Sequence, residues 1–308
     1  LVLFPKWLPF HLYEVSSWTR AMVVPLSIIN HFRPTRILPP ELHLHELYPV
    51  GTEMRDFSLP RDRHRLLTWR NFFLGCDRLL KLHEKLPAKP LRQKALKAAE
   101  AWMLERLGEG SDGLAAIFPA MLNALIALQC LGYPAEHPVY QKAWKDLEDL
   151  FIEDPEDFRI QPCLSPVWDT AIATIAIGEA GREEDLPRIQ AARRWLEAQE
   201  IRFAGDWKER VHGVEPSGWA FEYNNRYYPD TDDTAMVLMA MRYDHQTGGA
   251  TRDCIVRALR WQMALQCKDG GWGAFDKDVT RGWLEDVPFA DHNAILDPTC
   301  SDLTARTL

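Results

Sequence analysis

The sequence lacks the patterns that mark several large classes of protein. Its six cysteines are widely scattered without a C-x-x-C pair, at Cys76, Cys130, Cys163, Cys254, Cys267 and Cys300. This usage fits reduced thiols that fill a core better than a disulfide framework or a zinc site. Basic residues are outnumbered, with 36 Lys and Arg against 44 Asp and Glu, and the formal net charge is -8. That balance argues against a nucleic-acid partner, because phosphate binding needs a basic face.

Long apolar runs free of polar residues are also missing. The nearest match to a membrane span, residues 115–133, contains a proline, an asparagine and a glutamine, so we expect a buried core helix there. Apolar residues within 5–9 and 23–29 leave a contact with a bilayer surface open if no partner covers them. The chain starts at Leu1 and stops at Leu308 inside an expected helix, which predicts a piece of a longer protein.

The residues that are present predict helices. The chain has 308 residues, 46% of them hydrophobic, which is enough for a large core and about two domains. Apolar residues recur at helical spacing over 65–86, 91–107, 121–131, 168–180, 189–199, 234–243 and 255–266. No convincing run of alternating strands is found, and Pro, Gly and Asp gather in the connections. We predict an all-α chain built from helical hairpins.

Twelve tryptophans are present, and several belong to a repeated unit. Each unit is a basic helix with an aromatic residue, then a glycine-containing turn that ends in a second aromatic or aliphatic residue. The paired positions are Trp102 with Leu114, Trp195 with Trp207, and Trp261 with Trp272, at spacings of 12, 12 and 11 residues. Such repeats predict stacked or circular helical arrays. We expect the tryptophans to close the turns by burial, and a Gln side chain to hydrogen-bond the free amides of the next helix.

Three carboxylates fall within four residues at Asp230, Asp232 and Asp233, where a polar loop meets the apolar run 235–241. Neighbouring carboxylates cannot all ionise freely, so at least one is expected to keep its proton at neutral pH. The cluster is therefore a candidate Brønsted acid. Two other interpretations stay open, because Asp and Thr are ordinary N-cap residues before an apolar helix and carboxylates also bind Mg²⁺.

Several motifs occur in order along nearly the whole chain, at residues 13–18, 165–170, 218–221, 230–235, 261–272, 271–276 and 302–306. The segment 261–272 resembles the glutamine-tryptophan repeat of squalene and oxidosqualene cyclases. The Asp-x-Asp-Asp-Thr-Ala segment 230–235 resembles the acid motif of the squalene-hopene cyclase branch. The oxidosqualene enzymes typically have a single acidic Asp in a Cys-containing motif, so the three-Asp form favours the squalene branch.

The resemblance implies two α/α barrels of the terpene cyclase type, with the first interrupted in sequence by the second. Residues 1–150 would form part of the inserted barrel, and residues 151–308 the N-terminal half of the catalytic barrel, which is incomplete here. We expect the chain expressed alone to be inactive and poorly folded, because an open barrel exposes an apolar wall.

The resemblance also implies proton-initiated cyclisation of squalene to pentacyclic hopene and hopanol in hopanoid biosynthesis, with no metal and no cofactor. Asp232 stands at the position that protonates a terminal alkene, and Asp230 and Asp233 would favour its protonated state. Many relatives have a His, supported by an Asp four residues earlier, where this chain has Arg306 after Asp302. A fixed Arg charge stabilises a carboxylate but cannot shuttle a proton, so we assign Arg306 to acidity and reprotonation to water. A surface ion pair between Asp302 and Arg306 is the alternative.

The substrate-binding positions that the resemblance implies are Trp168, Phe221, Phe275, Trp18, Asp169, Phe289, Ala290, Val15 and Val23. Aromatic rings stabilise a cation without supplying a nucleophile. Trp168 and Phe221 would lie near the first rings formed, Phe275 beside them and Trp18 further along the cavity. The valines, Phe289 and Ala290 would form a constriction of an apolar channel, with simple core packing as the alternative. Phe275 replaces the Tyr of some relatives.

The partners implied are squalene, a membrane surface and a second copy in a homodimer. The expected location is peripheral, or monotopic, on the cytoplasmic side of a bacterial inner membrane. Three alternatives stay open: a class II diterpene cyclase that protonates a prenyl diphosphate, Mg²⁺-dependent ionisation of such a substrate, and a non-catalytic helical scaffold. The run His-Leu-His-Glu at 43–46 also suggests a metal site, but a polar surface turn is expected because partners are lacking elsewhere.

Overall fold

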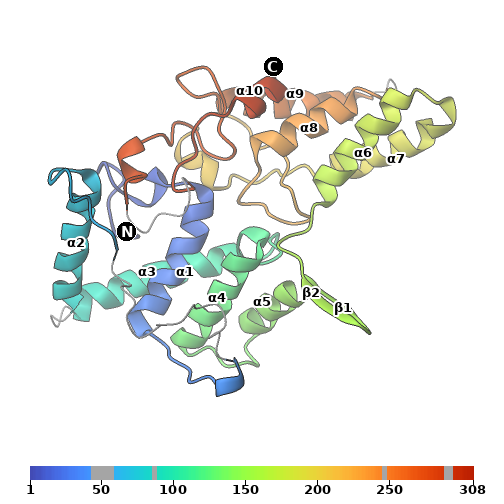
Figure 1. Ribbon diagram of the computed structural model, residues 1–308. Coiled ribbons are helices and arrows are strands. Elements are labelled where there is room, and N and C mark those ends of the chain that lie inside the picture. Colours follow the sequence, from blue (N-terminus) through green and yellow to red (C-terminus); the bar gives the residue numbers. More distant parts are fainter. Residues whose placement is uncertain (43–58, 85–88, 245–247, 288–293) are drawn as a thin grey trace.

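The structure is a computed structural model that describes residues 1–42, 59–84, 89–244, 248–287 and 294–308. Figure 1 shows two groups of helices, one formed by the first half of the chain and one by the second. The helices are α1 (Ser17–Phe32), α2 (Trp69–Glu84), α3 (Lys89–Leu107), α4 (Phe118–Leu131), α5 (Pro138–Glu148), α6 (Pro166–Ala180), α7 (Leu186–Ala198), α8 (Thr231–Met241), α9 (Gly249–Ala264) and α10 (Ser301–Thr307). The predicted all-α class is confirmed.

The first group packs α1 against α3 and α4, and α5 against α4, around one apolar core. Helix α1 begins at a cap in which the Ser16 hydroxyl accepts a hydrogen bond from the Thr19 amide at 3.2 Å. Helix α4 ends at Gly132, whose φ of 88° suits a residue without a side chain. Leu125 and Leu128 of α4 are buried, as expected for a core helix within 115–133. Among the described helices, none has the length and apolarity that a bilayer crossing needs.

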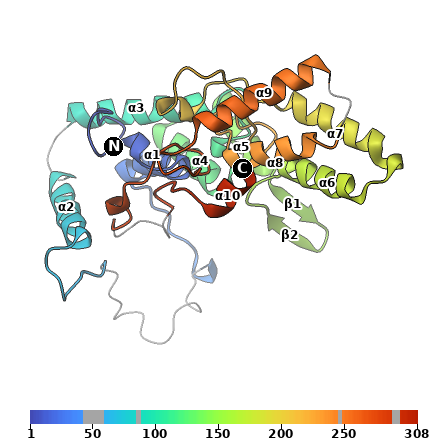
Figure 2. The ribbon, with the colours of Figure 1, turned by 90° about the horizontal axis from the view of Figure 1, so that it is seen from above.

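The second group is centred on α8. Seen from above, α8 lies between α9 and α6 (Figure 2), and it contacts both of them as well as α10. Helix α7 packs against α6 and completes the hairpin. Buried side chains of this group include Val237 and Met241 of α8 and Ala258 of α9. These contacts fix the start of α8 at the side of the molecule that faces the first group.

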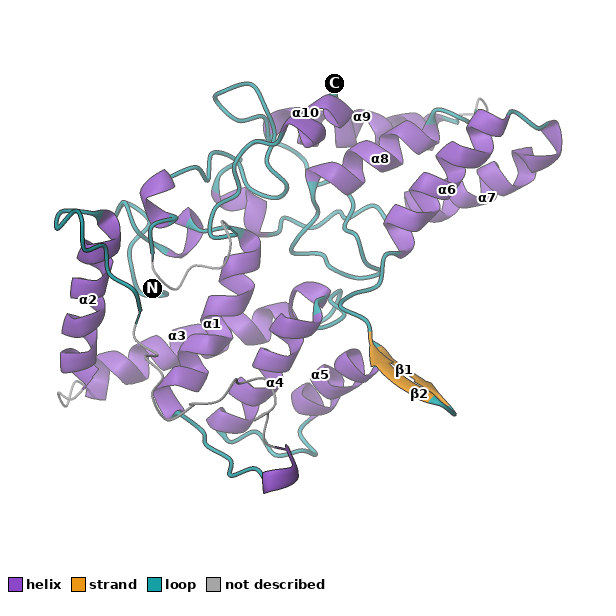
Figure 3. Cartoon of the chain, in the orientation of Figure 1, coloured by secondary structure: helices purple, strands orange, loops and turns teal. Residues whose placement is uncertain are grey.

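A two-stranded hairpin extends from the connection between α5 and α6 (Figure 3). Its strands are β1 (Phe151–Asp154) and β2 (Asp157–Ile160), which pair antiparallel with Phe151 opposite Ile160. Our expectation of a chain without strands is wrong at this point. Each strand has only 4 residues, and β2 is exposed throughout, so no buried face imposes an alternating pattern on the sequence.

The turn of the third tryptophan repeat is closed by burial of Trp272, as expected. The indole Nε1 of Trp272 donates to the Gln262 carbonyl at 2.7 Å. The Gln262 amide in turn donates to the Thr231 carbonyl at the start of α8, at 2.9 Å. Gln266 donates to the Gly270 carbonyl at 2.8 Å, so it secures its own turn and not the free amides of the next helix. The expectation that this Gln bonds the free amides of the next helix is therefore wrong, because its partner is the carbonyl of Gly270.

Two smaller expectations concern single residues. Cys254 and Cys267 are buried, but Cys300 is exposed, so the prediction that the cysteines are core filler is wrong for Cys300. The run His-Leu-His-Glu at 43–46 lies outside the described residues.

Candidate active site

A cavity of about 430 Å³ lies where the two groups of helices meet. Its wall draws residues from the start of α1, from α6, from α8 and α10, and from the loops before α8 and after α9. The predicted site residues that line it are Trp18, Trp168, Phe221, Phe275, Asp230, Asp232 and Asp233. The structure thus brings the acidic cluster and the aromatic residues together around one space.

Asp230 places the acidic cluster at the cavity because it is the N-cap of α8. Its backbone is extended, and its carboxylate accepts a hydrogen bond from the Asp233 amide at 2.7 Å. The Thr234 hydroxyl donates to the Asp230 carbonyl at 2.6 Å and so strengthens the first turn. The N-cap interpretation is therefore correct for Asp230. It is compatible with the acid interpretation, because the same cap directs Asp232 and Asp233 to the cavity wall.

The start of α8 is also tied to the segment that carries Phe275. The Thr231 amide donates to the Ala274 carbonyl at 2.8 Å, and the Thr231 hydroxyl donates to the Gly273 carbonyl at 2.7 Å. All of these groups are buried or half-buried. Because Phe275 follows Ala274 directly, these two bonds fix an aromatic side of the cavity relative to the acidic residues.

Asp232 forms an ion pair with the guanidinium of Arg306, which comes from α10. The pKa of Arg306 is raised, chiefly by this hydrogen bond to Asp232. Asp302 is exposed and acts on Arg306 only through its charge. The alternative of a surface ion pair between Asp302 and Arg306 is wrong, because Arg306 pairs with Asp232 instead.

The buried carboxyl groups around Asp232 hold protons more tightly than free carboxyl groups do. Burial raises the pKa of Asp230 well above its ordinary value, and the charge of Asp233 adds to the rise. Burial, with the charges of Glu222 and Asp232, raises the pKa of Asp233 to about 7. Burial likewise raises the pKa of Glu222 to about 8. These groups titrate together, so the cluster retains protons at neutral pH, as the spacing of the three Asp residues predicts.

Two pairs of aromatic rings line the same cavity as Asp232. The centroids of Trp168 and Phe221 are 6.2 Å apart, and those of Trp18 and Phe275 are 5.9 Å apart with the rings edge to face. The guanidinium carbon of Arg306 lies 5.5 Å from the centroid of Trp168. Since Arg306 also pairs with Asp232, it connects the Trp168 ring with the acidic cluster.

Other predicted residues do not line the cavity. Asp169 is exposed, and its carboxylate accepts a hydrogen bond from the Ser165 hydroxyl at 2.9 Å. Val15 is buried in a separate apolar cluster with Leu284, which agrees with the core-packing alternative. Val23 lines a different hollow beside α3. Phe289 and Ala290 lie outside the described residues.

Sequence reasoning missed three polar residues of the cavity wall, which are Glu222, Asn225 and Tyr228. The Asn225 side-chain amide donates to the Glu222 carboxylate at 3.0 Å. Burial raises the pKa of Tyr228. The signal that was available is the position of Glu222 directly after Phe221, where a charged residue stands in an aromatic, non-helical segment.

Asp232 pairs with Arg306, and the Asp230 carboxylate accepts from the Asp233 amide at the cap of α8. Oδ1 of Asp233 is buried without a hydrogen-bond partner among the residues that the structure describes. Within the described part of the chain, no group of three or more His, Cys, Asp and Glu side chains is arranged to hold a metal ion.

Comparison with known proteins relates this geometry to a family. The family model described as squalene-hopene cyclase N-terminal domain matches residues 1–156, and that of the C-terminal domain matches residues 164–308. A probable squalene-hopene cyclase of Sinorhizobium fredii is 37% identical over 309 residues, which cover 99% of this chain and 47% of that protein. A squalene-hopene cyclase of Zymomonas mobilis is 38% identical, again over 99% of this chain and 47% of that protein.

A third relative carries a different name. A dammaradiene synthase of Dryopteris crassirhizoma is 36% identical over 100% of this chain and 44% of its own length. The chain therefore spans about half the length of the curated relatives that it matches. On the strength of the two domain matches, the chain belongs to the squalene-hopene cyclase family.

Proposed function

We propose that the full-length protein cyclises squalene to pentacyclic hopene and hopanol, and that Asp232 starts the reaction by protonating a terminal alkene. The observation that carries the proposal is the placement of Asp232, paired with Arg306, on the wall of a cavity lined by five aromatic side chains. Relatives named squalene-hopene cyclase support the substrate. The dammaradiene synthase supports triterpene cyclisation as the wider class, so hopene is the finer part of the proposal.

Protonation of an alkene demands a strong acid and a stabilised conjugate base. Lowering the pKa of the acid by one unit requires about 1.4 kcal/mol of extra stabilisation of its carboxylate relative to its protonated form. Arg306 supplies a fixed positive charge next to the carboxylate that remains after proton transfer. Arg306 favours loss of the proton, whereas Asp230 and Asp233 favour its retention. Buried neighbouring carboxyl groups keep protons within the cluster until substrate enters.

The cation formed by protonation then needs stabilisation without a nucleophile. Trp168 and Phe221 form the aromatic pair that Arg306 connects to Asp232, because the guanidinium pairs with Asp232 and lies 5.5 Å from the centroid of the Trp168 ring. A desolvated cation gains about 2 kcal/mol or more from an aromatic face. Trp18 and Phe275 form the second pair, which supports a role in the later ring closures.

A membrane-surface location is part of the proposal. Squalene is a hydrocarbon, so an enzyme that takes it from a bilayer needs an apolar contact surface. Exposed apolar residues on and just before α2 support this, namely Leu66, Leu67, Trp69 and Phe72. On α1, by contrast, Val24 and Ile28 are buried in the core, so only part of 23–29 remains available.

The test uses the full-length protein in membranes or detergent, supplied with squalene in the presence of a metal chelator. Lipid extracts of the native protein and of Asp232→Asn are compared by mass spectrometry. Asp253→Asn is the matched control, because Asp253 is an exposed aspartate on α9 away from the cavity lining. We expect pentacyclic product from the native protein and the control, and a loss of at least about 100-fold in Asp232→Asn.

Absence of a cyclic product from folded native protein would contradict the squalene proposal. A prenyl diphosphate would then be supplied with and without Mg²⁺, because a protonating cyclase and a metal-dependent one differ in that requirement. Equal product from Asp232→Asn and the native protein would overturn the assignment of Asp232 as the proton donor, but not the assignment of squalene as the substrate.

A further inference from the structure

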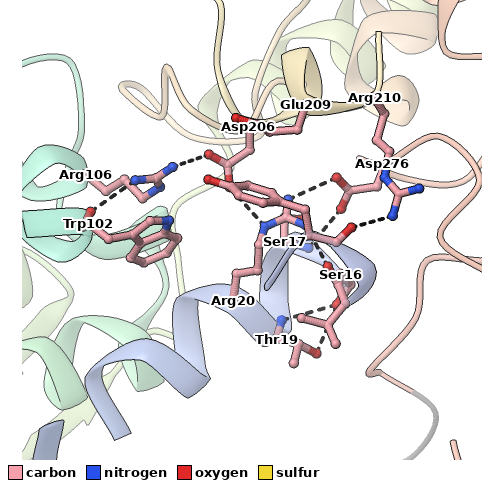
Figure 4. Close-up of polar contacts among 12 residues, drawn as sticks. Ser16, Ser17, Thr19, Arg20, Trp102, Arg106, Asp206, Glu209, Arg210 and Asp276 are labelled. Carbon is pink, nitrogen blue, oxygen red and sulfur yellow. Dashed lines mark hydrogen bonds and ion pairs between the residues drawn. The ribbon is translucent and has the colours of Figure 1, made fainter. Parts of the chain in front are cut away.

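A buried cluster of charges links the two groups of helices beside the cavity (Figure 4). Arg20 of α1 is fully buried and lies between Asp206 and Asp276, which belong to the second half of the chain. Arg106 of α3 pairs with the other oxygen of Asp206. The cluster thus contains two cations and two anions, and each charge has an opposite partner.

Arg20 connects three separate segments with three different nitrogens. Its Nε donates to Asp206 at 3.0 Å, and its Nη2 donates to Asp276 at 3.0 Å. Its Nη1 donates to the Val15 carbonyl at 2.6 Å, in the turn before α1. Only a planar guanidinium presents donors in these three directions at once, so lysine cannot replace the arginine without loss of at least one contact.

The Asp276 end of this connection reaches the cavity wall. One carboxylate oxygen of Asp276 accepts from Arg20, and the other accepts from the Ser17 amide at 3.0 Å. Trp18 follows Ser17, and Phe275 precedes Asp276, so both anchors are direct chain neighbours of the two rings. These rings lie edge to face and line the cavity.

We infer that Arg20 is a positioning residue that holds Trp18 against Phe275 and thereby fixes the second aromatic pair of the cavity. The inference rests on the proposed function, because the consequence of misplacing the rings is read in cyclisation products. A buried ion pair adds little stability over apolar packing of the same shape, but it specifies one geometry. The Arg20 ion pairs join the two groups of helices between which the cavity lies, so a fixed ion-pair geometry would also fix the shape of the cavity.

The test compares Arg20→Lys with Arg106→Lys in the full-length protein. Arg106 is the matched control because it is buried in the same cluster and pairs with the same Asp206, but it donates to the Trp102 carbonyl and not to Asp276. Each protein is incubated with squalene, and the ratio of incompletely cyclised to pentacyclic products is measured. Thermal denaturation midpoints are recorded beside it. The ratio does not depend on the amount of folded enzyme.

We expect Arg20→Lys to raise this ratio about tenfold, which corresponds to about 1.4 kcal/mol of lost cation stabilisation. Both variants should lower the denaturation midpoint by similar amounts. Arg106→Lys should nevertheless leave the ratio of incompletely cyclised to pentacyclic products within about twofold of the native value. An unchanged ratio in Arg20→Lys, or an equal rise in both variants, would overturn the inference. If the native protein forms no cyclic product, the proposed function fails first, and that outcome is distinct.

A second variant keeps the test decisive if Arg20→Lys does not accumulate as folded protein. Asp276→Asn removes a charge but retains one oxygen that can accept from the Ser17 amide. It should raise the ratio less than Arg20→Lys, by about threefold. A native ratio in folded Asp276→Asn would contradict the proposed connection between Arg20 and the aromatic pair.

Discussion

Replacement of Glu222 by glutamine should change how the stability of the full-length protein depends on pH. Burial raises the pKa of Glu222 from an ordinary 4.5 to about 8. The folded protein therefore keeps this proton between those values, whereas the unfolded chain releases it. Stability that the bound proton contributes is fully present below pH 4.5 and is lost as pH rises toward 8.

The magnitude follows from the width of that window. A shift of one unit is worth about 1.4 kcal/mol, so the native protein loses up to about 1.4 kcal/mol per pH unit through this group. Across the window from 4.5 to about 8 the loss is on the order of 5 kcal/mol. The glutamine side chain of Glu222→Gln would not titrate, and its amide oxygen can still accept the hydrogen bond from Asn225.

Charged and polar groups face Glu222 from several segments. Asp230 and Asp112 raise its pKa through their charges, while the Asn225 amide lowers it. Glu222 in turn raises the pKa of Asp233 and of Cys163. Removal of its charge should therefore lower the pKa of Asp233.

The assay is denaturation of native protein and Glu222→Gln at several pH values between 5 and 8. The control is Glu156→Gln, at an exposed residue in the turn of the β1–β2 hairpin. The stability of Glu222→Gln relative to native protein should rise steadily with pH, while the control shows no such trend. A difference that stays constant from pH 5 to pH 8 would refute the reasoning.

Other parts of the site and the chain as a whole give four more predictions. Arg306→Gln should lower kcat for squalene by about tenfold to 100-fold, with partial recovery in Arg306→Lys, because a positive charge beside Asp232 is restored. Phe221→Leu should raise the yield of early-terminated products by about tenfold in lipid extracts, because one ring near the acid is lost. Asp297→Asn should destabilise the protein by about 1 to 3 kcal/mol in denaturant titrations, because Asp297 accepts three backbone N–H groups of residues 274–276. The chain on its own should show neither a cooperative thermal transition nor cyclase activity in a melting scan and a squalene assay.

The sequence predicted α3, α6 and α9, because apolar residues at helical spacing over 91–107, 168–180 and 255–266 overlap all three helices. Two helices were not predicted, α1 and α5. Helix α1 contains Pro25, a residue that usually ends a helix, and polar residues occupy its first turn, although Val24 and Ile28 are buried. Helix α5 is only 11 residues long and buries only three of its side chains, Tyr140, Ala143 and Leu147. Tertiary packing stabilises helices whose local sequence pattern does not predict them.

The candidate site was predictable where short motifs carry the chemistry. The Asp cluster combines N-cap residues with crowded carboxylates, and both properties are visible in the sequence. Glu222 was not predictable in the same way, because its importance comes from burial between Asn225 and the cluster, which only the folded chain creates. The Arg20 connection was missed for a related reason, since Arg20 lies 186 residues from Asp206 and 256 from Asp276.

The most direct test of the central claim is cyclisation of squalene by the full-length protein in D₂O. If a carboxylic acid in exchange with solvent starts the reaction, the hydrocarbon product should carry one deuterium, incorporated at the carbon that was protonated. Asp232→Asn should give no labelled product. A cyclic product that contains no deuterium, or one formed equally by Asp232→Asn, would contradict protonation by Asp232 as the initiating step.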